Sequence, residues 1–187
     1  GNLKEPVTEG TKKVARCFYA LEQSRADRKR YPAVNPIDSY SKYIEYPEFE
    51  EYIKTKIEGD WIGMVNQMKT LLLRGKEVQE QINILGDDGV PVDYHVTFWK
   101  SEVIDYVILQ QDAFDDVDAV TSLERQEDIL NLVTEICEKD FKFTEFGDCV
   151  TYFRKLINLC KQMNYSEYKS EKYNDFVSQI KAMLAAA

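Results

Sequence analysis

The chain has 187 residues and a formal net charge of −9, with 44% hydrophobic and 30% charged residues. This composition excludes collagen-like, low-complexity and disordered chains, and the length fits one domain or one domain with part of another. The negative charge argues against nucleic acid and anionic membrane surfaces as partners, because both repel an anionic protein.

The sequence contains no secretory signal peptide and no apolar run of the roughly 20 residues that a membrane-spanning helix needs. We therefore expect a cytoplasmic protein. The four cysteines form no C-x-x-C pair and His95 is the single histidine, so we predict neither a metal site nor a disulfide framework. Because the first residue is Gly1 and not Met, we also expect the chain to be a piece of a longer protein.

The first predicted elements are a helix and a connector. Apolar periodicity predicts a helix over Val14 to Ala26, which ends before Pro32 because the residue before a proline is disfavoured in helical conformation. Residues 34–46 predict an extended or turning connector. A long amphipathic helix follows over about 60–85, and Gly86 ends it.

The second half of the chain is predicted to be helical almost throughout. Composition alone allows a short strand over 92–98, and a helix begins near Ser101. A helix over about 123–139 opens with Thr121 and Glu124 at the separation of a capping box. Two more amphipathic helices have the apolar positions Val150, Phe153, Ile157 and Cys160, and then Tyr173, Phe176, Val177, Ile180 and Met183. Since the links are short, we predict an all-α fold, an antiparallel helical bundle.

Three patterns that resemble catalytic or binding motifs fail on their details. Gly75-Lys76 is not a phosphate-binding loop, because Glu77 replaces the required Ser or Thr. Nothing orients His95 and a cysteine as base and nucleophile, which favours a structural or surface histidine. The acidic cluster at 112–118 lacks the spacing of a calcium loop, which favours a solvated acidic loop.

Two aromatic segments are harder to dismiss. Tyr31 lies between a helix end and the rigid Pro32 to Pro36 segment, and Phe114 follows Gln110 and Gln111 at a predicted helix terminus. Each ring could stack on a ligand or pack into the core. The residues alone leave both interpretations open.

Several runs in the chain resemble, in the same order, the C-terminal part of the catalytic A subunit of V-type and archaeal A-type rotary ATPases. The matching runs are 5–12, 18–22, 31–41, 84–89, 109–114 and 117–126. The run at Tyr31 is also similar to the F-type catalytic beta subunit. Beyond residue 126 only the helical pattern is similar.

The resemblance implies two parts: residues 1–45 as the tail of a nucleotide-binding domain and 46–187 as a helical C-terminal domain. The phosphate-binding lysine, magnesium ligands and catalytic glutamate of the family belong to a preceding region, and the arginine finger comes from the neighbouring B subunit. We therefore expect no catalytic residue in this chain and no ATP hydrolysis by it alone. ATP or ADP with Mg²⁺ is expected to bind the intact subunit, but this chain no tighter than about 1 mM.

The resemblance also assigns candidate site residues. The adenine pocket is implied to include Tyr31, Pro32, Gln110, Gln111, Ala113 and Phe114. The turn Gly86, Asp87, Asp88 and Gly89 aligns with the loop by which the family contacts the central rotor stalk. The chain departs from the V-type pattern at Tyr31, where Phe is usual and stacking is kept, at Pro36, where Trp is usual, and at Asp112, where the Asn-to-Asp change adds charge near the nucleotide.

The resemblance implies that the protein couples ATP hydrolysis or synthesis to the transport of ions such as protons. It also implies a location in the soluble cytoplasmic headpiece of a peripheral membrane complex. The implied partners are the B subunits of the V-type ATPase, in an alternating hexamer, and the central stalk subunits, with no nucleic acid and no membrane insertion. One alternative is a freestanding α-helical interaction module without nucleotide binding, whose aromatics are all core. Another is an independent enzyme that uses His95 and a thiol.

Overall fold

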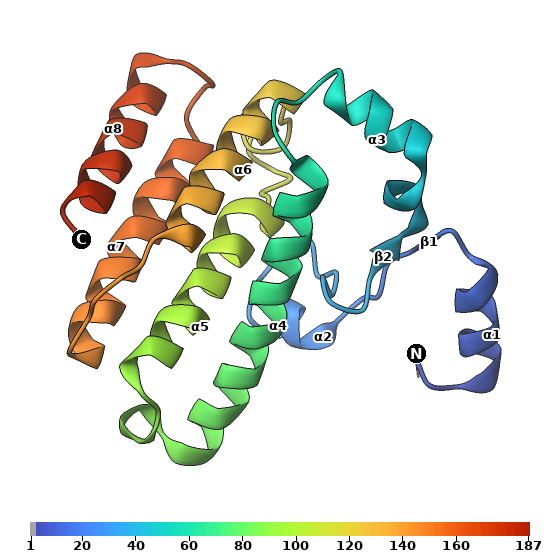
Figure 1. The fold of residues 1–187 in the computed structure, drawn as a ribbon, viewed down its shortest axis with the longest axis horizontal. Helices are drawn as coiled ribbons and strands as arrows, with labels where there is room; N and C mark the ends of the chain where they lie inside the picture. The colour runs from blue at the N-terminus through green and yellow to red at the C-terminus, as the bar shows by residue number, and fades with distance from the viewer. Residues whose placement is uncertain (1–2) are drawn as a thin grey trace.

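A computed structural model describes residues 3–187 as a bundle of five helices with an N-terminal segment along one flank (Figure 1). Gly1, on which the expectation of a longer protein rests, lies outside the described residues. None of the helices in residues 3–187 combines the length with the apolar character that a membrane span requires.

The bundle confirms the all-α prediction. It consists of α4 (Trp61–Leu85), α5 (Val92–Ile104) continued by the π-helical turn η3 (Asp105–Leu109), α6 (Leu123–Glu138), α7 (Phe146–Asn164) and α8 (Glu171–Ala185). Successive helices run in opposite directions, and α5 packs against α4, α6 and α7 (Figure 1). The short 3-10 turn η2 (Asp87–Gly89) closes the α4–α5 hairpin.

The core of the bundle is apolar and aromatic. Its largest fully buried apolar side chains are Phe153, Ile104, Ile136, Leu156, Met163 and Ile180. Phe153 packs edge-on against Phe141 with ring centroids 5.0 Å apart. Each such buried side chain contributes about 1.5–3 kcal/mol to folding. The predicted apolar faces of α7 and α8 both contribute to this core, and α7 packs against α5 as well as α8.

The helices α4 and α5 are in tight contact at Gly75. A Cβ atom added there would lie 1.9 Å from Ser101 Oγ, so only glycine allows this approach. The helix α4 ends as predicted at Gly86, whose φ of 77° lies in the region that glycine adopts without strain.

The N-terminal segment contains only short elements. They are α1 (Pro6–Val14), β1 (Cys17–Phe18), α2 (Gln23–Asp27), β2 (Tyr40–Ser41), the 3-10 turn η1 (Lys42–Glu45) and α3 (Pro47–Lys54). The strands β1 and β2 form a two-stranded antiparallel ladder in which Phe18 opposes Tyr40. The connector predicted over 34–46 thus includes a strand and a 3-10 turn.

Several sequence predictions at the level of single elements are wrong. Residues 14–26 do not form one helix, because Cys17 and Phe18 pair with Ser41 and Tyr40 and tertiary pairing overrides local periodicity. Residues 92–98 are helical, not a strand, and the helix expected from Ser101 begins at Val92. A short run of β-branched and aromatic residues cannot distinguish a strand from a buried helix.

The cap of α6 also differs by one residue from the prediction. Ser122 Oγ, not a Thr121 side chain, accepts the hydrogen bond from the Arg125 backbone N–H. The cap thus lies one residue later, which puts Arg125 and not Glu124 at the third helical position.

Candidate functional site

The two aromatic segments singled out by the sequence lie side by side. The backbone N–H of Gln111 donates to the carbonyl oxygen of Tyr31 at 3.0 Å, which joins segments 80 positions apart. Tyr31 is 52% exposed and Phe114 is 99% exposed. Neither ring is a core residue, so the core-packing interpretation of both is wrong.

Residues 110–118 form a loop held by its own acidic side chains. Asp118 accepts from the backbone N–H of Asp112 at 2.7 Å, and Asp112 accepts from that of Phe114 at 2.9 Å. Asp112 also accepts from the Tyr165 hydroxyl at 3.2 Å. The carboxylate of Asp112 is therefore used to shape the loop that presents Ala113 and Phe114.

A cavity of about 300 Å³ lies behind this loop. Gln110, Gln111 and Asp118 line it together with apolar side chains that include Trp61. The Gln110 side-chain oxygen is buried there without a hydrogen-bond partner. Burial raises the pKa of Asp118.

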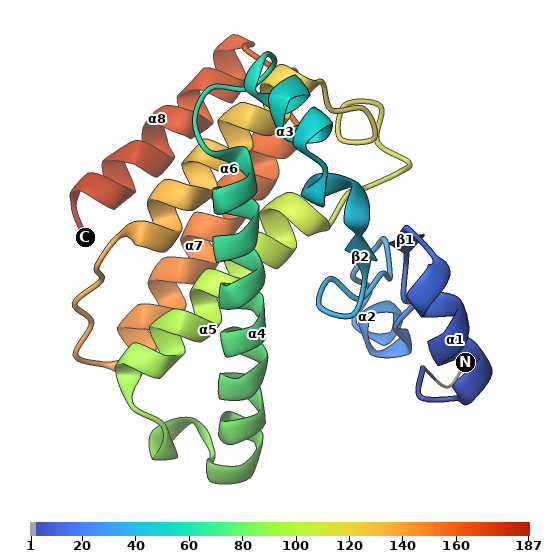
Figure 2. The same cartoon turned by 45° about the vertical axis from the view of Figure 1, so that its right-hand side comes forward.

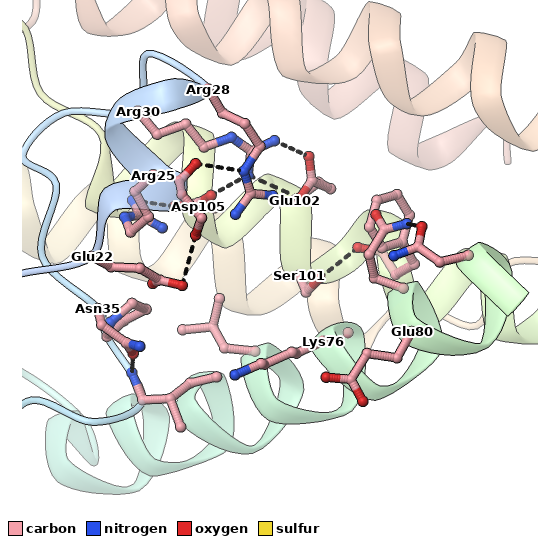
Figure 3. A pocket seen from close by; sticks show the side chains of 18 residues that line it. Glu22, Arg25, Arg28, Arg30, Asn35, Lys76, Glu80, Ser101, Glu102 and Asp105 are labelled. Carbon is pink, nitrogen blue, oxygen red and sulfur yellow. Dashed lines mark hydrogen bonds and ion pairs between the residues drawn. The ribbon is translucent and has the colours of Figure 1, made fainter. Parts of the chain in front are cut away.

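A buried ionic cluster joins the N-terminal segment to α5 (Figure 3). Arg25 Nη2 donates to Asp105 Oδ1 at 2.7 Å, and Arg30 donates to the other oxygen of Asp105 and to Glu102, with 2.5 Å between Arg30 Nη2 and Glu102 Oε2. The Arg30 guanidinium lies 4.4 Å from the centre of the Tyr106 ring. The charged side chains of the cluster are 6–13% exposed.

The charge of Arg30 is stabilised in spite of its burial. Burial lowers its pKa, but hydrogen bonds and attraction from Glu102, followed by those from Asp105, outweigh that effect and raise the pKa overall. A cavity of about 320 Å³ beside the cluster is also lined by Arg28 on the same side and by Lys76 and Glu80 of α4 on the other (Figure 3).

The turn Gly86 to Gly89 lies at the opposite end of α5 from Gln110 (Figure 2). Asp87 and Asp88 are exposed. The backbone carbonyl of Asp87 is hydrogen-bonded at 2.9 Å to Nε2 of His95, which is 1% exposed and packs its ring 4.3 Å from that of Phe146. His95 therefore has a structural role, as the sequence favoured.

Comparison with known proteins identifies the family. A sequence model described as the C-terminal domain of V and A type ATP synthase matches residues 50–145, which is more than half of the chain. The chain belongs to this family. The match includes the Gly86–Gly89 turn and the 110–114 loop.

Curated relatives extend this ATP synthase similarity over almost the whole chain. The V-type ATP synthase alpha chain of Borrelia duttonii is 35% identical over 184 residues, which are 98% of this chain and 30% of the relative. That of Treponema denticola is 34% identical over 185 residues, which are 99% of this chain and 29% of the relative. The chain thus spans about 30% of the length of these relatives.

A solved structure shares the fold. The ATP synthase subunit NeqB from Nanoarcheaum equitans superposes with a TM-score of 0.55 at 15% identity, over 75% of this chain and 32% of that one. At this identity the comparison supports the helical architecture of the ATP synthase domain and no residue roles.

The ionic cluster is not among the sites predicted from the sequence. The available signal was Asp105, a charge that lies between Val103-Ile104 and Val107-Ile108 in an otherwise apolar run. A charged residue in such a run is buried only with a partner, and Arg25 and Arg30 are those partners.

Proposed function

We propose that this chain is the C-terminal part of the catalytic subunit of a V/A-type rotary ATPase, which couples ATP hydrolysis or synthesis to ion transport. In this proposal residues 1–45 end the nucleotide-binding domain and residues 46–187 form the helical domain. Tyr31 with Pro32 and the loop residues Gln110, Gln111, Ala113 and Phe114 surround the adenine of MgATP. The turn Gly86–Gly89 contacts the central stalk.

The hydrogen bond between Gln111 N and the Tyr31 carbonyl carries this proposal. It brings together the two segments whose side chains would enclose the base, and the rings of Tyr31 and Phe114 are both accessible. Base–aromatic stacking contributes about 1–3 kcal/mol per base, enough to orient a nucleotide whose phosphates are bound elsewhere. By itself this is too little to retain ATP on the isolated chain.

The family assignment also supports a place in a multisubunit headpiece. In the proposed complex the chain lies in the cytoplasmic headpiece, next to a B subunit and the central stalk subunits. A freestanding interaction module is not favoured, because relatives named V-type ATP synthase alpha chain align with nearly the whole chain.

Substitution of Tyr31 in the intact ATPase tests the adenine pocket. Tyr31→Ala is expected to raise the KM for ATP by about tenfold, because it removes one stacking face. Tyr31→Phe keeps the face and is expected to leave the KM unchanged. Tyr43→Ala is the matched control, because Tyr43 is a comparably exposed tyrosine of the same segment. Equal KM values for Tyr31→Ala and Tyr43→Ala contradict the proposed pocket.

The proposed stalk contact is tested by the double substitution Asp87→Ala with Asp88→Ala. Exposed charges contribute only about 0–1 kcal/mol each, so we expect the turn to act by its shape and the variant to keep its torque. Single-molecule rotation of the assembled complex measures this. Loss of torque in the double variant shows that the carboxylates, and not the shape of the turn, transmit force.

A further inference from the structure

We propose that Arg30 and Asp105 are positioning residues for the nucleotide site, because together they fix the Tyr31 segment to the end of α5 that leads into Gln110 and Gln111. The inference rests on the proposed function for the identity of the ligand. It deepens that function by naming residues that touch no nucleotide themselves.

Asp105 is the point at which both segments are held. Its two carboxylate oxygens accept from Arg25 and Arg30 of the N-terminal segment. Its backbone carbonyl accepts from the N–H of Gln110 at 2.9 Å, where the chain leaves the π-helical turn η3. The side chain of Asp105 thus fixes one segment while its backbone fixes the other.

The contacts form a closed ring. Arg30 is bound to Asp105, Asp105 to Gln110, and Gln111 to Tyr31, which directly follows Arg30 in the chain. A relative movement of the two segments must break at least one of these bonds. Because the cluster is buried, loss of one partner leaves an uncompensated charge, and that cost favours a single arrangement of the segments.

The opposite end of α5 is held at the proposed stalk contact. His95, near the start of the helix, is hydrogen-bonded to the Asp87 carbonyl. With η3 the helix spans roughly 25 Å at about 1.5 Å per residue. A helix fixed at both ends moves as one body, so the orientation of α5 and the geometry around the adenine are set together.

Asp105→Asn in the intact ATPase is the main test, because it removes the charge and keeps the shape. If the ordered arrangement falls to a tenth of the population, the KM for ATP rises by about tenfold. Since saturating ATP selects the ordered arrangement, kcat is expected to change little. The matched control is Glu124→Gln, which removes one carboxylate from an exposed ion pair with Lys169.

Amide hydrogen exchange on this chain tests, without nucleotide, whether Asp105 holds the Tyr31 segment against Gln111. Asp105→Asn is expected to accelerate exchange of the Gln111 N–H by at least about tenfold, since its acceptor Tyr31 is then no longer held. Exchange at Leu156, in the core of α7, reports whether the bundle remains folded. If Asp105→Asn unfolds the bundle, Glu102→Gln is the substitute variant. It is expected to accelerate exchange of the Gln111 N–H as well, but by a smaller factor.

Rescue separates positioning from simple stability. Arg30→Lys keeps the charge but not the forked pairing with Glu102 and Asp105, so its KM is expected to lie between those of wild type and Arg30→Gln. Two results overturn the inference. One is that Asp105→Asn leaves the exchange rate of the Gln111 N–H unchanged. The other is that Asp105→Asn accelerates this exchange but has the same KM for ATP as the Glu124→Gln control. If neither Tyr31→Ala nor Asp105→Asn changes the KM, the proposed nucleotide site is wrong. If Tyr31→Ala raises the KM and Asp105→Asn does not, only the positioning role is wrong.

Discussion

The bundle and the N-terminal segment are held in place by different forces. In α4–α8 the helices bury apolar faces against one another, with Phe153, Leu156 and Ile180 almost inaccessible to solvent. Among described residues before 57, the buried side chains are those of Ala20, Arg25, Arg30 and Asn35. The helices α1 and α3 bury no residue.

This difference indicates where the domain is rigid and where it can be rearranged. Apolar burial depends little on direction, whereas the ionic cluster holds only in one geometry. A segment attached through directional polar bonds has a defined position without a core of its own. The segment that contains Tyr31 is attached in this way.

The largest expected effect is loss of the core of the bundle. Phe153→Ala is expected to lower the free energy of unfolding by about 3–5 kcal/mol, because it leaves a cavity among packed aromatic rings. Urea denaturation followed by circular dichroism measures the change. Leu73→Ala on the exposed side of α4 is the control, with an expected change below about 1 kcal/mol. Equal losses in the two variants contradict an apolar core centred on Phe153.

A smaller effect is expected where α4 crosses α5 beneath the ionic cluster. Gly75→Ala is expected to lower the free energy of unfolding by about 1–3 kcal/mol, because its Cβ overlaps Ser101 Oγ and the helices must separate. Gly147→Ala in α7 is the matched control, since a Cβ there meets no atom within 4 Å. Thermal unfolding compares the two. If Gly75→Ala leaves the thermal stability unchanged, α4 and α5 can separate at this point without loss of stability.

The smallest expected effect is a difference in thiol labelling rate between the two regions. Burial raises the pKa of Cys149 to about 11 and is the largest cause of a pKa of about 12 at Cys137 and Cys160, whereas Cys17 in β1 is partly exposed. At pH 8 a disulfide reagent is therefore expected to label one thiol quickly and three only after unfolding. Cys17→Ser is expected to abolish the fast phase. A fast phase of more than one thiol shows that the bundle opens.

The raised thiol pKa values also predict how the stability of the bundle depends on pH. The thiol pKa values are higher in the folded protein than the ordinary value of 9.0. Their contribution to stability is present below pH 9 and is lost as the pH rises towards 11–12. Alkaline unfolding of the bundle is therefore expected to shift to higher pH when Cys160 is replaced by Ala.

The sequence predicted α4, α6, α7 and α8 but missed the first half of α5 and the short elements. The spacing of Trp61, Val65, Met68 and Leu72 is repeated over enough turns to identify α4, and Gly86 marks its end. The pairing of Cys17 with Ser41 involves residues 24 positions apart, which local periodicity does not contain. Elements of two residues are decided by tertiary contacts.

The candidate site was predictable only in part. The residues alone left Tyr31 and Phe114 undecided, and the resemblance to rotary ATPases placed them at one site. The hydrogen bond from Gln111 to Tyr31 agrees with that placement, but the adenine contact itself stays a prediction. The partners of Asp105 lie 75 and 80 positions away in the chain, so no local pattern shows them.

The bond from His95 to the α4–α5 turn has a practical consequence. It is made to the backbone carbonyl of Asp87, so the course of the turn does not depend on which side chains stand at 87 and 88. Both positions are exposed. They are thus suitable places to attach a fluorophore or a cross-linker to the tip of the hairpin without altering its backbone.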